Sequence, residues 1–263
     1  MARSFSDRQT ELWAFIKRAD RKNSKLAIFI HGWRGGYLST WGDLAQYLEI
    51  HADTHDVFRE WDYLFLGYET YSVSSLLDIA ELVAERWSKA SRGEPPFEQQ
   101  YEKLALVGHS LGTLGIRQLL CALSIQPNGL LTAIKKVLLL GSPMNGSPLA
   151  GYADIGPLFD LFRGKVGALH PDSYQINDAL RPDGQILKML HTWNSTVRKN
   201  NYPNIPIKVV LGTNDRVVGP KGMTQWDGDT EVRTTPHSHS TLCKVPGGQT
   251  EALIIDELKG VLA

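Results

Sequence analysis

Short apolar runs recur along the chain and alternate with longer amphipathic segments. Five runs are apolar at most positions, and most of them end at glycine: residues 26–30, 63–67, 104–108, 137–141 and 207–212. Runs of this length without polar alternation are typical of strands that are buried on both faces of a parallel sheet. The pattern therefore predicts a buried sheet built from these five strands.

Helical periodicity separates several of these runs. Apolar residues recur every three or four positions between Val73 and Trp87, and Ser75 stands where a helix N-cap is expected. Segments 111–124 and 251–262 repeat this spacing. Strands separated by helices predict an α/β fold with a mainly parallel sheet flanked by helices. Ligands of such sheets bind beyond the carboxyl ends of the strands, which is where candidate chemistry is sought.

The segment from about residue 149 to 200 departs from this rhythm. It is longer than an ordinary crossover, and proline or glycine interrupts it at Pro157, Gly164, Pro171 and Pro182. Apolar side chains nevertheless recur within it, at Leu158, Phe159, Leu161, Phe162 and Leu169. We interpret the segment as a modest helical cap or lid inserted into a single domain that spans residues 1–263.

Charge and composition narrow the class of protein. The chain has 28 basic and 28 acidic side chains in 263 residues, so its formal net charge is zero and it lacks the basic footprint of a nucleic-acid binder. Basic residues concentrate between Lys17 and Lys25, which we interpret as the solvated end of a helix. Cys121 and Cys243 form no CxxC pair, which argues against a disulfide scaffold.

Localisation follows from the distribution of apolar residues. No apolar run approaches the roughly 18 residues of a membrane span, and the first twenty residues carry scattered charges instead of a signal-peptide core. The expectation is a cytoplasmic protein without an integral membrane segment. These patterns do not indicate an oligomeric state.

A candidate nucleophile stands at the end of the third apolar run. The segment Gly108-His109-Ser110-Leu111-Gly112 has the form G-x-S-x-G, with a predicted strand before it and a predicted helix after it. In this setting a serine occupies a sharp strand-to-helix turn, and small flanking residues leave its hydroxyl uncovered. The alternative is a tight turn in which the serine has no chemical role.

A nucleophilic serine needs a base, and the base needs an acid that orients it. In hydrolases with this turn the chain order is serine, then aspartate or glutamate, then histidine. Asp215 stands just after the predicted strand 207–212 and is the preferred acid. Asp227 and Asp229 compete, but they lie in a polar stretch that is typical of an exposed turn.

Two histidines are candidates for the base. His237 and His239 both follow a predicted last strand over residues 230–235. Residues two apart are not equivalent here, because only one of the two side chains is expected to face the serine. The residue pattern alone leaves the choice between them open.

The oxyanion hole requires two N–H donors. One is expected from the backbone of Leu111, which follows the nucleophile. The other is expected from the glycine-rich loop 31–36, with the backbone amide of Trp33 as the preferred donor. The alternative for this loop is an ordinary glycine-rich turn.

The motifs together resemble an α/β-hydrolase of the lipase and esterase type. The resemblance is greatest to the serine-active-site (SERAC-like), GPI-inositol-deacylase-like and DUF676 lipases. It rests on the His31-Gly32 loop, on Tyr101-Glu-Lys-Leu-Ala-Leu-Val-Gly-His-Ser-Leu-Gly, on Leu140-Gly-Ser-Pro-Met-Asn-Gly-Ser-Pro-Leu-Ala and on His239-Ser-Thr-Leu-Cys-Lys. The last segment resembles the one in which the family's catalytic histidine precedes a Cys-Lys pair, and this likeness selects His239. Thr113 departs from the family, which usually has a further glycine at that position.

The resemblance implies a serine hydrolase that cleaves carboxyl esters through an acyl-enzyme, with Ser110, His239 and Asp215 as its catalytic triad. A small-molecule acyl ester is the expected substrate, and neither a cofactor nor a metal is expected. A thioesterase, amidase or acyltransferase could use the same triad. A non-catalytic ligand-binding protein of the same fold is the alternative outside enzymes.

Other motifs favour no further chemistry. His51 and His55 have a helical metal-binding spacing, but the glutamate of H-E-x-x-H and a clear third ligand are missing from that segment. The sequence contains neither G-x-x-x-x-G-K-[ST] nor G-x-G-x-x-G, so nucleotide binding has no motif to support it.

Overall fold

An eight-stranded sheet forms the centre of the protein. The computed structural model describes residues 3–5, 13–17, 23–51, 54–69, 73, 75–125, 128–147, 180–182, 184–201, 205–219, 229–247, 249 and 251–263. The strand order is β1-β2-β4-β3-β5-β6-β7-β8. β1 and β2 pair antiparallel, as do β2 and β4, and every pairing from β4 to β8 is parallel. The strands are β1 (Arg3–Phe5), β2 (Trp13–Lys17), β3 (Lys25–Ile30), β4 (Trp61–Leu66), β5 (Lys103–His109), β6 (Ile134–Leu140), β7 (Ile207–Gly212) and β8 (Glu231–Thr235).

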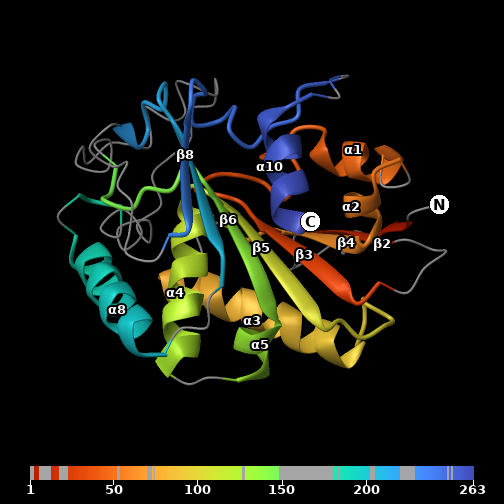
Figure 1. Ribbon diagram of the computed structural model, residues 1–263, viewed down its shortest axis with the longest axis horizontal. Coiled ribbons are helices and arrows are strands. Elements are labelled where there is room, and N and C mark those ends of the chain that lie inside the picture. The colour runs from red at the N-terminus through yellow and green to blue at the C-terminus, as the bar shows by residue number, and fades with distance from the viewer. Residues whose placement is uncertain are drawn as a thin grey trace.

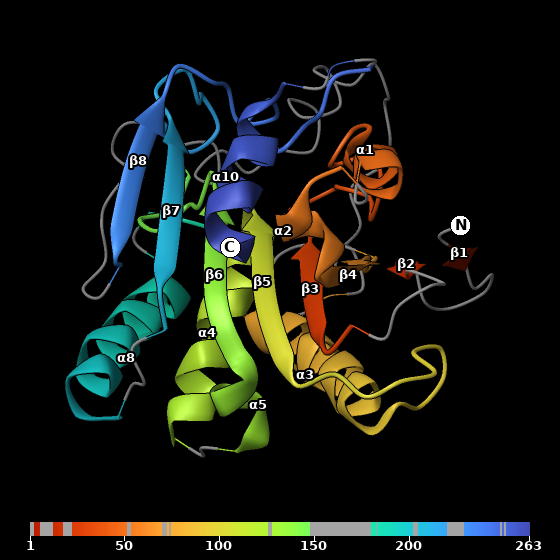
Figure 2. The ribbon, with the colours of Figure 1, turned by 45° about the vertical axis from the view of Figure 1, so that its right-hand side comes forward.

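Helices cover both faces of this sheet (Figures 1 and 2). Side chains of β3 alternate between two cores, with Leu26, Ile28 and Ile30 on one face and Ala27 and Phe29 on the other. The first core also contains α3 (Leu76–Arg92), α4 (Leu111–Ile125) and α5 (Gly129–Ala133), and the second contains α1 (Leu44–His51), α2 (Asp56–Arg59) and α10 (Leu253–Leu262). Burial on both faces explains why the central strands are apolar at nearly every position.

The predicted sheet is confirmed at its centre and incomplete at one edge. Each of the five apolar runs overlaps one of the strands β3 to β7, and β8 lies within the predicted last strand. β1 and β2 were not predicted from the sequence. The interpretation of the basic cluster as the end of a helix is wrong at Lys17, which is the last residue of strand β2. A strand of five residues, most of them apolar, gives too short a pattern to identify by periodicity.

The predicted N-cap of α3 is confirmed in detail. The Ser75 side chain accepts a hydrogen bond from the backbone N–H of Asp78, and the Asp78 side chain accepts one from the backbone N–H of Ser75. The helix ends at Gly93, whose positive φ of 70° suits a residue without a side chain. α3 packs against α4 so closely that a Cβ at Gly115 would lie 2.4 Å from an Ile79 side-chain carbon.

The predicted cap falls largely outside the described residues. Residues 148–179 and 183, and with them the apolar side chains proposed to form the cap, are not described. The described end of the segment is α8 (Gln185–Asn201), which packs against α4. Leu187 and Leu190 of α8 are buried in the core on that face of the sheet. Helix α8 therefore belongs to the helices that flank the sheet.

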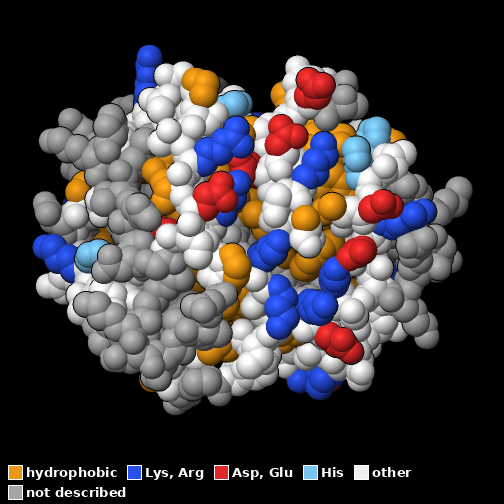
Figure 3. All heavy atoms as spheres, in the orientation of Figure 1, with side chains coloured by type: hydrophobic (Ala, Val, Ile, Leu, Met, Phe, Trp, Pro, Cys, Tyr) orange, Lys and Arg blue, Asp and Glu red, His pale blue; other side chains and the backbone are white. Residues whose placement is uncertain are grey.

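Charges on the visible surface are mixed in sign. Basic and acidic side chains are interspersed over the face shown in Figure 3. Among the described residues, Lys208 pairs with both Glu231 and Glu257, and Arg233 also pairs with Glu257.

In the described part of the chain, no helix is both long enough and apolar enough to cross a membrane.

Candidate active site

Ser110 occupies the turn between β5 and α4. Its φ of +53° is one of three positive values among the described non-glycine residues. A left-handed serine is strained, and such strain is typical of a sharp strand-to-helix turn that exposes a nucleophile. The backbone N–H of Ser110 donates to the Leu140 carbonyl at 3.0 Å, which ties the turn to the end of β6.

The hydroxyl groups of Thr113 and Ser142 stabilise this turn through hydrogen bonds. The Thr113 hydroxyl lies 2.6 Å from the Ser110 carbonyl oxygen and donates to it, and the backbone N–H of Thr113 donates to the same oxygen at 2.9 Å. Ser142 Oγ lies 2.5 Å from Thr113 Oγ1, and both side chains are fully buried. Because the Thr113 proton is used toward Ser110, Ser142 is the donor in this pair. Thr113 thus has a defined structural role at this turn, which no sequence signal indicated.

The loop after β3 lies directly against the serine. A Cβ at Gly32 would lie 2.5 Å from the Cβ of Ser110 and 3.1 Å from its Oγ, so only glycine permits this approach. Two residues after the serine, a Cβ at Gly112 would lie 2.4 Å from the Ile30 carbonyl oxygen. The two glycines bring the loop and the start of α4 together around the hydroxyl.

The orientation of the loop is set by His31. His31 Nδ1 lies 2.7 Å from the Gly32 carbonyl oxygen, while its Nε2 accepts the backbone N–H of Tyr68 at 3.2 Å. Nδ1 therefore carries the proton and donates to Gly32. The Gly32 carbonyl and the Trp33 N–H belong to one planar peptide, so this bond also orients the predicted oxyanion donor.

Leu111 begins α4, and the first N–H groups of a helix have no acceptor within the helix. Its amide is therefore available beside the serine. The predicted second donor, the amide of Trp33, directly follows Gly32, which lies against Ser110. The positive end of the helix dipole favours negative charge at this position. The arrangement suits a tetrahedral oxyanion.

Asp215 lies at the carboxyl end of β7, and its side chain is almost fully buried. One carboxylate oxygen, Oδ1, accepts the backbone N–H groups of Val217 and Val218, each at 2.9 Å. The other, Oδ2, lies 2.7 Å from Nδ1 of His239. Burial favours the neutral acid, but the hydrogen bonds from His239 and the two amides outweigh it and hold the pKa of Asp215 below its ordinary value.

The structure pairs His239, and not His237, with Asp215. The imidazole of His237 instead contacts Thr235, with Nδ1 and Oγ1 2.6 Å apart. The His239 ring lies over Gly141, where a Cβ would be 3.2 Å from Nδ1. Both Ser110 and His239 are described, and no hydrogen bond joins the serine hydroxyl to this imidazole; such bonds are often long before substrate binds.

The competing acids are placed differently. Asp229 is buried and forms an ion pair with Arg117 of α4, so its carboxylate is used in the core. Asp227 lies outside the described residues.

Other reactive groups described near the site favour no different chemistry. Burial raises the pKa of the Cys243 thiol to about 12, so this thiol remains protonated near neutral pH and is a poor nucleophile. Within the described part of the chain, no group of three or more His, Cys, Asp or Glu side chains could hold a metal ion.

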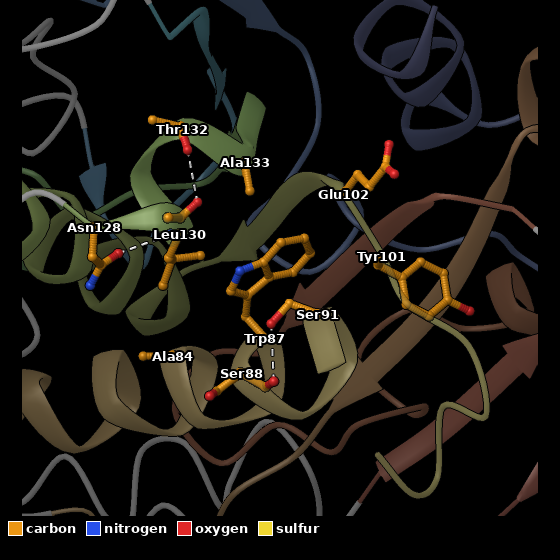
Figure 4. Close-up of a pocket in the computed structure, with 11 residues that line it drawn as sticks. Ala84, Trp87, Ser88, Ser91, Tyr101, Glu102, Asn128, Leu130, Thr132 and Ala133 are labelled. Atoms are coloured by element: carbon orange, nitrogen blue, oxygen red, sulfur yellow. Dashed lines mark hydrogen bonds between the residues drawn. The ribbon is translucent and has the colours of Figure 1, made fainter. Parts of the chain in front are cut away.

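A separate cavity of about 510 Å³ opens at the other end of β5 (Figure 4). Trp87 and Ser88 of α3 line it together with Glu102 and with residues of α5. It adjoins the amino end of β5, whereas Ser110 follows the carboxyl end, about 20 Å away at ~3.3 Å per strand residue. The side chain of Asn128 in its wall caps α5 by accepting the backbone N–H of Leu130. This cavity is therefore distinct from the serine site.

Comparison with known proteins establishes the fold. No protein-family model and no curated protein matches the sequence. The mature form of the lipase BlEst2 from Bacillus licheniformis has a TM-score of 0.64 over 94% of this chain and 97% of that chain, at 16% identity. Phospholipase PlaB from Legionella pneumophila, in complex with thio-NAD, has a TM-score of 0.51 over 72% of this chain but only 38% of that chain, at 20% identity.

A dienelactone hydrolase from Anabaena variabilis gives a TM-score of 0.51 over 97% of this chain and 93% of that chain, at 10% identity. Sequence identities this low demonstrate likeness of fold, because one fold hosts many activities. The chain has the α/β-hydrolase fold.

Proposed function

We propose that this protein is a serine hydrolase that cleaves carboxyl esters through an acyl-enzyme. Ser110 is the nucleophile, His239 the general base and Asp215 the residue that orients it. The backbone amides of Trp33 and Leu111 form the oxyanion hole. The observation that carries the proposal is the 2.7 Å contact between Asp215 Oδ2 and His239 Nδ1. In a neutral imidazole the proton then lies on Nδ1, so Nε2 can accept the proton of the serine.

The reaction follows from this protonation state. Nε2 of His239 accepts the Ser110 proton as Oγ bonds to the ester carbonyl carbon, and the two amides stabilise the resulting oxyanion. The imidazolium then donates that proton to the leaving alcohol as the carbon–oxygen bond breaks. Water attacks the acyl-enzyme with the same base, which releases the acid and restores the serine. The lowered pKa of Asp215 keeps its carboxylate ionised and able to stabilise the imidazolium.

Two further arguments support ester chemistry. The similar structures include a lipase and a phospholipase, although their low identity supports the reaction class only by analogy. The sequence motifs resemble the SERAC-like, GPI-inositol-deacylase-like and DUF676 lipases, and Ser110 and His239 occupy the matching positions. Asp215 is supported separately by its place after β7 and its contact with the base.

Labelling with a fluorophosphonate tests the nucleophile. The wild-type protein should be labelled and should hydrolyse a p-nitrophenyl ester, whereas Ser110→Ala should lose labelling and several orders of magnitude of turnover. A non-catalytic binding protein would not be labelled at all. Retention of a tenth of wild-type turnover in Ser110→Ala would exclude Ser110 as the nucleophile.

A pair of histidine variants tests the base. His239→Ala should lose labelling and turnover because the serine hydroxyl then has no proton acceptor. His237→Ala should retain most turnover, because its imidazole contacts Thr235 and not Asp215. The opposite result would transfer the role of base to His237.

We also propose that the substrate is an uncharged acyl ester, as the zero net charge and the apolar residues of segment 149–200 predict. Each additional buried CH₂ of the acyl chain should stabilise the bound transition state by about 0.8 kcal/mol, and so raise kcat/KM, until the pocket is filled. A panel of esters, thioesters and amides of graded chain length measures this preference and separates the esterase from the thioesterase and amidase alternatives. A preference for anionic or peptide substrates would contradict the proposal.

A further inference from the structure

His109 contacts the proposed base from the position next to the nucleophile. Its Nε2 lies 2.9 Å from the backbone carbonyl oxygen of His239, and the two imidazole rings are 4.8 Å apart at 48°. His109 precedes Ser110 in the chain, so one residue of the nucleophile turn bonds to the backbone of the base across 130 residues of sequence. The proposed mechanism assigns this residue no role.

The tautomer of His109 follows from its surroundings. A carbonyl oxygen can only accept a hydrogen bond. Nε2 of His109 therefore carries the proton and donates a hydrogen bond to the backbone carbonyl oxygen of His239. Nδ1 is buried and finds no hydrogen-bond partner among the described residues, and the rings of Trp41 and His109 are in a T-shaped arrangement with centroids 6.5 Å apart. Burial, followed by the proximity of His239, lowers the pKa of His109 to about 3. His109 is therefore a neutral donor at physiological pH.

Three of the contacts that described residues make with His239 each restrict a different part of it. Asp215 binds Nδ1 of the imidazole, Gly141 lies beneath the ring, and His109 binds the main-chain carbonyl. The first two contacts orient the ring about its own side-chain bonds. Only the third among them fixes the backbone from which the side chain extends, and it does so relative to His109, the last residue of β5, which the serine directly follows.

We propose that His109 is a positioning residue, which ties the backbone of the base to the nucleophile turn and so sets the separation of Ser110 and His239. This inference rests on the proposed function of those two residues. A misplacement of about 1 Å between reacting groups can lower a rate by roughly a hundredfold. Loss of this hydrogen bond should therefore lower kcat strongly and change KM little.

Three variants separate the hydrogen bond from the volume of the ring. In His109→Gln the amide nitrogen is as many bonds from Cβ as Nε2 of histidine, so it can reach the His239 carbonyl. In His109→Asn the amide nitrogen corresponds to Nδ1 and stops short of it. His109→Phe keeps a flat ring but has no donor. Melting temperatures of all three variants establish that each is folded at the assay temperature.

The measurements are kcat, KM and the rate of fluorophosphonate labelling. His109→Asn and His109→Phe should lose about tenfold to a hundredfold in kcat and in labelling rate, with KM changed less than threefold. His109→Gln should stay within about threefold of wild type in both rates. Equal losses in the Gln and Asn variants, or no loss in any variant, would overturn the inference while leaving Ser110 as nucleophile. Absence of labelling in the wild-type protein would remove both the proposed function and the inference.

A spectroscopic readout tests the geometry without turnover. The Nδ1 proton of His239 that is shared with Asp215 should give a low-field proton resonance. This resonance should persist in His109→Gln and broaden or shift in His109→Asn, because only the second variant releases the backbone of the base. An unchanged resonance in His109→Asn would show that Asp215 and Gly141 suffice to hold His239, and would overturn the inference.

Discussion

At the residue scale, Ser110 combines its proposed role as nucleophile with a strained backbone. Its φ of +53° costs a non-glycine residue about 1–2 kcal/mol, and glycine avoids that cost but loses more chain entropy on folding. Ser110→Gly should therefore be more stable to urea than Ser110→Ala by about 0.5–1 kcal/mol, with both variants inactive. Equal unfolding free energies of the two variants would show that the turn is unstrained.

Asp215 makes stability depend on pH in a defined direction. Burial favours its neutral form, yet the hydrogen bonds to His239 and to the two amides hold its folded-state pKa below the unfolded value of about 4. A depressed folded-state pKa contributes stability above the unfolded value, and this contribution is lost as pH falls through the folded value. The unfolding free energy of wild type minus that of Asp215→Asn should therefore decrease as pH falls below about 4.

Urea unfolding of both proteins at neutral pH and at several acid pH values measures this difference. The same variant should lose about a hundredfold to ten-thousandfold in kcat, since asparagine no longer stabilises the required imidazole tautomer. A difference that grows toward acid pH would show that the carboxylate is not stabilised in the fold.

At the scale of elements, the contact between the loop after β3 and the turn after β5 depends on glycine. A Cβ at Gly32 would lie 2.5 Å from that of Ser110, so Gly32→Ala must displace the loop and the peptide of Trp33. Turnover should fall by at least a hundredfold, the order expected for loss of one oxyanion donor. Gly32→Ala with wild-type kcat would remove this loop from the oxyanion hole.

Gly260 provides the matched control for that substitution. It lies in α10, and nothing is within 4 Å of a Cβ built there. Gly260→Ala should therefore keep wild-type turnover and gain about 0.5–1 kcal/mol of unfolding free energy from the better helix propensity of alanine. A comparable loss of turnover in this variant would mean that the effect at Gly32 is not local.

Element prediction succeeded where the pattern was long or complete. β3 to β7 are apolar runs buried on two faces, and α3 combines a regular stripe with a capping box. β1 and β2 are short and form the antiparallel edge of the sheet, so their few residues carry no distinctive period. Their pairing is decided by the neighbouring strand β4, which lies more than forty residues further along the chain.

At the scale of the whole molecule, the buried pair of Arg117 and Asp229 joins α4 to the segment just before β8, across 112 residues of sequence. Both side chains are inaccessible to solvent. Asp229→Asn takes one negative charge away from the buried Arg117 guanidinium, so the variant should lose about 3–5 kcal/mol of unfolding free energy. The double variant Arg117→Met/Asp229→Leu should recover much of this loss.

The same variants distinguish the two acids. At a temperature where Asp229→Asn remains folded, its ester turnover should be close to that of the wild type, whereas Asp215→Asn should be nearly inactive. A stable but inactive Asp229→Asn would transfer the role of orienting acid to Asp229. Urea unfolding and turnover measured on the same preparations provide both results.

Features that depend on neighbouring residues could be predicted from the amino-acid sequence. The apolar runs predicted the central strands, and the glycines around Ser110 predicted its turn, because backbone conformation responds to adjacent residues. The same local reasoning could not separate His237 from His239, and it favoured Asp215 over Asp229 only by position. Resemblance to known lipases selected His239, and the catalytic roles remain predictions.

Which distant side chains meet is seen in the folded chain and not in the sequence pattern. The fold pairs His239 with Asp215, His237 with Thr235 and Asp229 with Arg117. It also places His109 against the backbone of His239 and the Thr113 hydroxyl beneath Ser110. The physical reason is that these contacts depend on strand order and register, which bring together residues separated by long stretches of sequence, and no local pattern encodes that separation.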